Sequence, residues 1–435
     1  MRPGNILILY LFLLPLIPAD ANIHIGVPWT HDRILICLLA LALLRQGVKT
    51  RFQVQICLPM LASSLVLLSL QVCSLQYSVQ SFTQKLFPIF SFVEQAFLLY
   101  ACVNLGRGPE GQEFRTRACQ AIVLSGSLLA VIGVFETVRG IPIFPTDMVH
   151  LRGSILRATA SMVNPIRFGA LLTMILPLAI GQAMKKRDFW SWCQAVMIAV
   201  GALSSLSRST YLALILVLLL GFFWWSRADL QHWRRRSVFF VTPLLALALV
   251  LSTRVPGFMS HKSLINVTNR IYMAKIALDI WRQHPFFGIG LQNFPHYAPK
   301  YHIYGLNAPR QVVVGPVKMD PNPPFSPLIS VFPDQPPIPD HPWAENAYLA
   351  LAAEMGSIGL LAYLWWVILG LVLLWKFRGQ SPREGYLLGC VVFLFVSLFF
   401  DTQLCFILIY EYWAFLGLGL SSPGQPQFRP PVHHS

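Results

Sequence analysis

Charged residues are scarce in this chain, and their scarcity excludes an ordinary soluble domain. Asp, Glu, Lys and Arg make up 12% of the 435 residues, whereas hydrophobic residues make up 55%. Typical soluble domains carry about 25% charged residues. The composition therefore predicts an integral membrane protein.

Disulfide, zinc and repeat signatures are also missing. The eight cysteines form no CxxC pair and no zinc-ligand spacing, and none lies between residues 254 and 345. We interpret them as small core residues rather than as a disulfide framework or a metal site. The chain shows no repeat of fixed period, which excludes a solenoid.

Long apolar runs are what the sequence has in abundance. A helix that crosses a bilayer needs about 20 apolar residues, and the weakest candidates, 5–19 and 33–45, fall short of this. We predict an all-α polytopic membrane protein with about 10–12 transmembrane helices. The candidate segments are 5–19, 33–45, 53–72, 87–105, 118–137, 166–184, 190–206, 209–225, 237–253, 346–375, 385–400 and 403–420.

Basic residues recur in every second loop between these segments, for example at 107–117, 185–187 and 234–236. Short loops rich in Lys and Arg stay in the cytoplasm, so both termini are predicted to be cytoplasmic. This alternation requires the N-terminal run to be kept as the first span, although it could also be a signal peptide. The net charge of +15 then reflects topology, and we expect no nucleic-acid partner.

One long polar segment interrupts this pattern and divides the chain into three parts. We predict helices in 1–253, a long loop on the non-cytoplasmic side in 254–345, and further helices with a cytoplasmic tail in 346–435. Within the loop, 266–284 predicts an amphipathic helix near the membrane surface, and 295–342 predicts a proline-rich lid. The expected features of that helix are an apolar face of Met273, Ile276, Ala277 and Ile280, a cap at Thr268 or Asn269, and Trp281 at the interface.

Arginines in the predicted external loops oppose the usual charge bias, so each needs a reason. Arg152 and Arg157 lie in one loop, Arg208 lies in a turn rich in serine, and Arg270 lies on the amphipathic helix. A guanidinium group binds phosphate oxygens through paired donors. These arginines could instead reach lipid headgroups, but Arg208 and Arg270 together favour a diphosphate ligand.

Four glycines and one buried carboxylate predict local structure. Gly288 and Gly290 indicate a tight turn. Gly356 and Gly359 indicate close approach of a neighbouring helix. Glu354 lies deep in an apolar segment, where we expect a structural role.

Four segments of the chain stand in a recognisable order and spacing. They are RATASMVNPIRFGALLTMILPLAI, LSSLSRSTYLALILVLLL, NRIYMAKIALDIWRQHPFFGIGLQNF and AENAYLALAAEMGSIGLLAYLWW. Together they resemble the O-antigen ligase and polymerase superfamily of polytopic membrane glycosyltransferases. The resemblance covers roughly residues 150–375, and HPFFGIG and AENAYLALAAEMGSIGLL are its most specific pieces.

The resemblance implies a multi-pass enzyme of the bacterial inner membrane that takes glycan from a polyprenyl diphosphate carrier. Arg208 and Arg270 match the positions where the family binds the diphosphate. The family commonly has a His followed by Asn at the start of the helix after the long loop, but this chain has Glu345 followed by Asn346. Glu345 and His341 are both candidate bases, and Asn346 is a candidate for binding the acceptor or for local positioning.

Transfer from such a donor needs stabilisation of the leaving diphosphate and removal of a proton from the acceptor hydroxyl. Arginines can supply the first, and the predicted external loops contain no DxD-like carboxylate pair, so we expect no metal and no other cofactor. The acceptor could be lipid A core, a growing glycan or a protein, so ligase, polymerase and protein O-oligosaccharyltransferase all remain open. A transporter of lipid-linked oligosaccharide is the alternative from another class, and membrane lipids are expected neighbours in every case.

Overall fold

The computed structural model contains helices at each predicted apolar segment that it describes. The described residues are 2–17, 22–24, 28–50, 58–74, 82–107, 110–144, 151–152, 155–162, 164–226, 261–298, 344, 346–376, 383–399 and 406–421. The predicted span 237–253 and most of the proline-rich segment lie outside these ranges.

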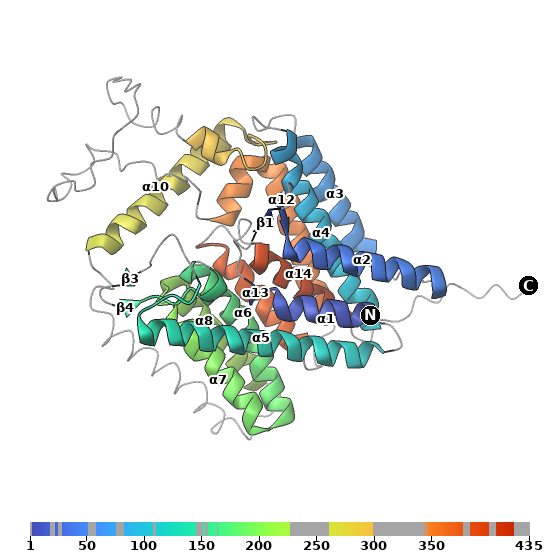
Figure 1. Ribbon diagram of the computed structural model, residues 1–435. Helices are drawn as coiled ribbons and strands as arrows, with labels where there is room; N and C mark the ends of the chain where they lie inside the picture. The colour runs from blue at the N-terminus through green and yellow to red at the C-terminus, as the bar shows by residue number, and fades with distance from the viewer. Residues whose placement is uncertain are drawn as a thin grey trace, which may run out of the picture.

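The helices follow the predicted segments closely, which confirms an all-α polytopic membrane protein (Figure 1). Two antiparallel pairs of very short strands accompany them: β1 (Asn22–His24) with β2 (Pro28–Thr30), and β3 (Leu151–Arg152) with β4 (Ile155–Leu156). The helices are α1 (Pro3–Leu13), α2 (His31–Thr50), α3 (Leu58–Ser74), α4 (Phe82–Arg107), α5 (Gly111–Arg139), α6 (Pro165–Lys186), α7 (Phe189–Ser204), α8 (Arg208–Ser226), α10 (His261–Gln283), α12 (Ala347–Lys376), α13 (Arg383–Val396) and α14 (Phe406–Leu420).

Four of the described helices are long and apolar enough to cross a membrane by length and composition. They comprise Pro88–Arg107 within α4, together with α5, α6 and α12. Helices α1, α3, α7, α8 and α14 are shorter apolar helices, as is the part Ile34–Arg45 of α2.

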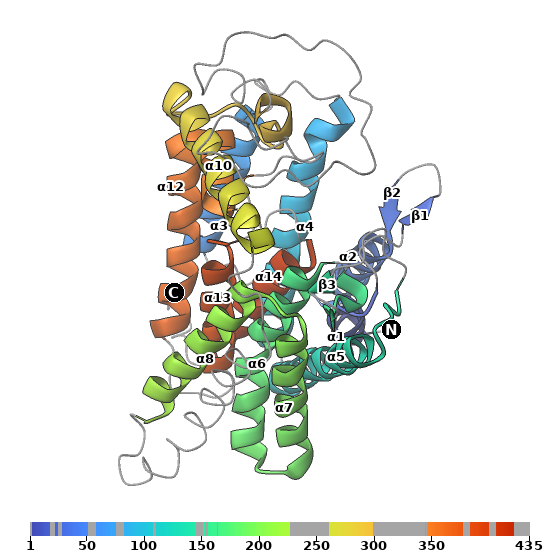
Figure 2. The ribbon, with the colours of Figure 1, turned by 90° about the vertical axis from the view of Figure 1, so that its left-hand side faces the viewer.

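Neighbouring helices pack side by side in the order α4, α14, α13, α6, α7 and α5, and α12 lies beside α3 and α14 (Figure 2). Aromatic side chains fill the space between α12, α13 and α14. Trp366 and Trp413 have ring centroids 4.1 Å apart, and Phe393 stacks on Tyr412 at 4.6 Å. All four side chains are buried, so the core between α12, α13 and α14 is largely aromatic.

Helices α6 and α13 run antiparallel in a register that small residues fix. A Cβ atom at Gly385 would lie 3.0 Å from Leu178 Cα, and one at Gly389 would lie 2.8 Å from the carbonyl oxygen of Met174. The first residues of α6 are therefore level with the turn 397–399 that follows α13.

The helix bundle has two ends, and each is marked by contacts among loops and helix termini. At one end, Arg2 pairs with Glu110 at 2.7 Å, and Arg115 donates to the carbonyl oxygen of Ser421 at 3.1 Å. At the other, Ala158 N donates to the Ser204 carbonyl and Ala347 N to the Ser397 carbonyl. We call the second the site end; it comprises residues 136–144, 155–162, 204–208, 346–349 and 397–399.

Helix α10 is amphipathic as predicted, but protein rather than lipid covers its apolar face. Met273, Ile276, Ala277 and Ile280 are buried against Ile289, Phe294, Ala344, Ala350 and Ala353. Trp281 is half-buried, and its Nε1 donates to Ser357 Oγ at 3.0 Å; its predicted place at the membrane interface stays a prediction. The predicted cap is also wrong, because the helix begins at His261 and runs through Thr268 and Asn269.

The segment after α10 inserts into a break in α12. Gly356 has φ 67° and ψ −170° inside this helix, and Ser357 N donates to the Pro285 carbonyl at 2.7 Å. On the other side of the break, Gly290 N donates to the Glu354 carbonyl at 2.8 Å. The close approach at Gly356 is thus made by the backbone of Phe286 and not by a neighbouring helix.

The predictions for the remaining glycines and for Glu354 have mixed outcomes. Gly288 and Gly290 both have positive φ, which confirms the tight turn. At Gly359, the three atoms nearest to an added Cβ belong to Met355 of the same helix, so the predicted helix approach there stays a prediction. Glu354 Oε1 accepts a hydrogen bond from Phe294 N at 3.1 Å, which is a structural role.

Candidate functional site

The turn before α8 places Arg208 at the first residue of that helix, at the site end. Leu206 has φ 48°, and the Ser205 hydroxyl accepts from Ser207 N at 3.3 Å. The Ser207 and Ser209 hydroxyls lie 2.9 Å apart. All three serines are buried and brace the turn, whereas Arg208 is partly exposed. The printed contacts of these hydroxyls are thus made within the turn that leads into α8.

The segment 155–162 lies against this same turn. Arg157 Nε donates to the Ser205 carbonyl at 3.1 Å, and Ala158 N donates to the Ser204 carbonyl at 3.1 Å. Arg157 thus contacts Ser205, which precedes Arg208 by three positions in the chain. Two arginines from different predicted loops are therefore connected through one turn.

A second support lies at the turn 397–399 that follows α13. Arg270 of α10 donates from Nη1 to the Phe399 carbonyl at 3.3 Å. Asn346 donates from Nδ2 to the Leu398 carbonyl at 2.8 Å, and its Oδ1 accepts from the backbone N–H groups of Tyr348 and Leu349 at 3.0 Å. Asn346 is thus the N-cap of α12 and at the same time a contact to the turn.

The two supports belong to the same end of the bundle because α13 packs against both α6 and α8. The turn 397–399 is level with the start of α6, and a Cβ atom at Gly169 of α6 would lie 2.7 Å from Ser205 Oγ. The helices between the two supports are therefore in direct contact. Arg157, Arg208 and Asn346 lie at the site end, and Arg270 contacts it through the Phe399 carbonyl.

Arg157 and Arg270 are oriented by backbone atoms. Each guanidinium group donates to a carbonyl oxygen, that of Ser205 for Arg157 and that of Phe399 for Arg270. Burial also raises the pKa of Tyr272, two residues after Arg270, so this phenol stays protonated.

Three predicted site residues cannot be placed by their side chains. His341 and Glu345 lie outside the described residues, and only the backbone of Arg152 is described, in β3. Their roles therefore stay predictions. Asn346, which directly follows Glu345 in the chain, is held at the start of α12 by the contacts given above.

Sequence reasoning missed two parts of this end. The turn 397–399 contributes only backbone carbonyl oxygens to these contacts, so no sequence motif marks it. Glu136 was read only as part of the apolar segment 118–137, yet its carboxylate accepts hydrogen bonds from three backbone N–H groups. A lone acid in the last turn of an apolar helix was the available signal.

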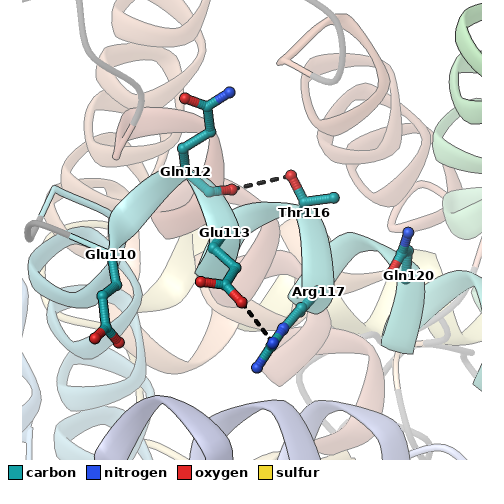
Figure 3. A pocket seen from close by; sticks show the side chains of 6 residues that line it. All are labelled: Glu110, Gln112, Glu113, Thr116, Arg117 and Gln120. Atoms are coloured by element: carbon teal, nitrogen blue, oxygen red, sulfur yellow. Dashed lines mark hydrogen bonds and ion pairs between the residues drawn. The ribbon is translucent and has the colours of Figure 1, made fainter.

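A polar pocket of about 680 Å³ lies far from these residues, at the start of α5 (Figure 3). Glu113 pairs with Arg117 at 2.5 Å there, and Thr116 donates to the Gln112 carbonyl at 2.9 Å. Glu136 is near the other end of the same helix, roughly 35 Å away at 1.5 Å per residue. The pocket is therefore not part of the site end.

The fold and the site end together define an all-α polytopic membrane protein that gathers arginines at one end of its bundle. Comparison with known families adds a more specific finding: residues 194–364 match the family model described as O-antigen ligase. This confirms the resemblance to the O-antigen ligase and polymerase superfamily and supports a function of that general kind. A search of curated proteins found no match.

The family match includes some predicted site residues and not others. Arg208, Arg270 and Asn346 lie within 194–364, as do the positions of His341 and Glu345. Arg152 and Arg157 precede the matched segment. Their assignment rests on the residues themselves and, for Arg157, on its contact with the turn before Arg208.

Proposed function

We propose that the protein transfers a glycan from a polyprenyl diphosphate carrier to an acceptor hydroxyl, as an O-antigen ligase-like enzyme of the bacterial inner membrane. In this proposal the site end and the long segment 254–345 face the periplasm, and both termini are cytoplasmic. The chain within 1–253 and 346–435 anchors the site in the membrane.

One observation carries the proposal: Arg157 and Arg208 lie at the site end of the bundle, and Arg270 donates to the Phe399 carbonyl at the same end. A diphosphate spreads its negative charge over several oxygens, and fixed guanidinium groups suit it because they donate in pairs. The family match over 194–364 supports the same reading, since it includes Arg208 and Arg270.

The reaction follows from the charges that must move. The acceptor oxygen attacks the anomeric carbon, the bond from this carbon to the diphosphate oxygen breaks, and the diphosphate leaves with the electron pair. Arg208 and Arg270 stabilise the growing negative charge, and Arg152 and Arg157 help to bind the donor. Glu345 or His341 takes the proton of the acceptor hydroxyl.

We propose that this enzyme needs no metal, because arginines supply the positive charge that a metal would otherwise provide. The two candidate bases differ in their chemistry. An imidazole with an ordinary pKa near 6.5 suits His341 to neutral pH. A carboxylate at Glu345 would need its pKa raised by burial.

The test is a transfer assay on purified protein in detergent with EDTA, using a radiolabelled polyprenyl diphosphate oligosaccharide. Transfer to added lipid A core or protein acceptor would support a ligase. Lengthened glycans without any other acceptor would identify a polymerase. No product with any acceptor would contradict the proposal and favour a transporter of the lipid-linked glycan.

A further inference from the structure

Glu136 lies in the last turns of α5, at the site end, and its side chain is fully buried. Its Oε2 accepts hydrogen bonds from Thr159 N at 3.0 Å and Ala160 N at 2.8 Å, and its Oε1 accepts from Ile143 N at 2.9 Å. A buried carboxylate is costly without such partners, and these three backbone donors satisfy it. All three belong to segments that follow α5 in the chain.

The helix itself gains little from this carboxylate. A negative charge near a helix C-terminus opposes the helix dipole. The helix already ends with Gly140 in the left-handed conformation, whose N–H donates to the Glu136 carbonyl at 2.8 Å. The carboxylate therefore stabilises the segment it binds rather than the helix that carries it.

The segment it binds has a backbone that needs such support. Ala160 has φ 43°, a conformation that residues with a side chain rarely adopt. Its N–H makes the shortest of the three hydrogen bonds to Glu136. The bond thus fixes an unfavourable conformation three residues after Arg157.

Arg157 connects this segment to the turn before Arg208. Ala158 N and Arg157 Nε donate to the carbonyls of Ser204 and Ser205, so the segment and the turn share two hydrogen bonds. We infer that Glu136 is a positioning residue that holds the 155–162 segment, and with it Arg157, in place for the donor diphosphate. The functional part of this inference rests on the proposed function.

The first experiment measures hydrogen exchange and does not depend on activity. The wild-type peptide 155–162 should contain strongly protected amides, although most of it is not helical. In Glu136→Gln, an NH₂ group replaces one of the two accepting oxygens and would face backbone N–H donors. Amide exchange in this peptide should therefore become at least tenfold faster. The control is Glu113→Gln on the same helix at the opposite end, which should leave the peptide unchanged. Unchanged exchange in Glu136→Gln, or an unprotected wild-type peptide, would overturn the positioning role.

The second experiment measures binding of undecaprenyl diphosphate, the carrier without its glycan. Glu136→Gln should weaken this binding at least fivefold and raise KM for the donor by a similar factor, with kcat within threefold. A positioning role acts on donor binding, whereas general loss of structure would lower kcat through loss of active protein. Normal binding by Glu136→Gln despite faster exchange would overturn the link to the diphosphate.

Failure of the proposed function has a different signature. If wild type and Arg208→Ala bind undecaprenyl diphosphate equally, the diphosphate site itself is wrong, whatever Glu136 does. The exchange experiment would still decide whether Glu136 holds the segment.

Discussion

Arg270 and Asn346 donate to adjacent carbonyl oxygens of one turn, those of Phe399 and Leu398, at 3.3 and 2.8 Å. Arg270 belongs to α10, within the segment 254–345, and Asn346 precedes the first residue of α12, directly after that segment. The turn therefore sets the distance between the proposed diphosphate-binding arginine and the residue that follows Glu345. A change on either side should reach the other through these carbonyls.

Asn346 offers a way to separate its two contacts. Asn346→Ser keeps an oxygen that can cap α12 but loses the donor to Leu398, and Asn346→Ala loses both. We expect Asn346→Ala to destabilise the protein by about 1 kcal/mol and Asn346→Ser by much less. Both should slow transfer, because both release the turn. Thermal unfolding and transfer rates in detergent would check this, and a full rate in Asn346→Ser would show that the turn contact is dispensable.

Arg270→Ala and Arg208→Ala should each lower the transfer rate by about 100-fold or more, because each removes a donor to the developing diphosphate charge. The matched control is Arg282→Ala on the same helix as Arg270. Its exposed side chain pairs with Asp279 at 3.3 Å, so its removal should change the rate less than twofold. Initial rates on protein with verified membrane insertion are the measurement, and near-normal rates in both variants would remove the diphosphate assignment.

Much of the fold could be predicted because apolar runs act locally. The segment 346–375 became α12, Ala347–Lys376, and 166–184 became α6, Pro165–Lys186. Each helix satisfies its own backbone groups, so the run alone dictates the element.

The supports of the site could not be predicted, because they join distant residues through backbone atoms. Arg270 and Phe399 are 129 positions apart, and the acceptor is a carbonyl oxygen that every residue possesses. The partner of the apolar face of α10 could not be predicted either, for a different reason. Its apolar face was visible in the sequence, but an amphipathic pattern does not distinguish lipid from protein as the partner.

Glu345 and His341 should respond differently to mutation, since only one of them is expected to act as the base. Loss of the base should lower the rate by about 10²- to 10⁴-fold and remove the corresponding limb of the pH–rate profile. The measurement is kcat against pH for Glu345→Gln and His341→Ala. If both variants keep the full rate, the base is another residue.

Gly356→Ala should destabilise the protein, because the break in α12 requires a conformation that is accessible essentially only to glycine. The backbone alone should cost about 1–3 kcal/mol. The new Cβ would also lie 2.2 Å from the Phe286 carbonyl oxygen. The control is Gly181→Ala in α6, where no atom beyond the neighbouring backbone of its own helix lies within 4 Å of the added Cβ, and it should be neutral or slightly stabilising. Equal melting temperatures for the two variants would contradict the break.

Asp188 predicts how stability depends on acid pH, away from the site. It is the N-cap of α7: Oδ1 accepts from Ser191 N at 2.7 Å and Oδ2 from Ser191 Oγ at 3.0 Å. The backbone hydrogen bond from Ser191 is the main cause that lowers the pKa of Asp188 below its ordinary value of 3.8. The folded state therefore favours the carboxylate, and this stabilisation is present above pH 3.8 and lost as the pH falls through the lower folded-state value.

Asp188→Asn isolates this effect, because asparagine still caps the helix but does not titrate. Wild type should exceed Asp188→Asn in melting temperature at pH 7, and the difference should shrink between pH 4 and pH 3 as the carboxylate becomes protonated. Thermal unfolding in one detergent at these pH values is the measurement. A difference that grows with acidity would mean that the folded state prefers the protonated acid, contrary to the hydrogen bonds from Ser191.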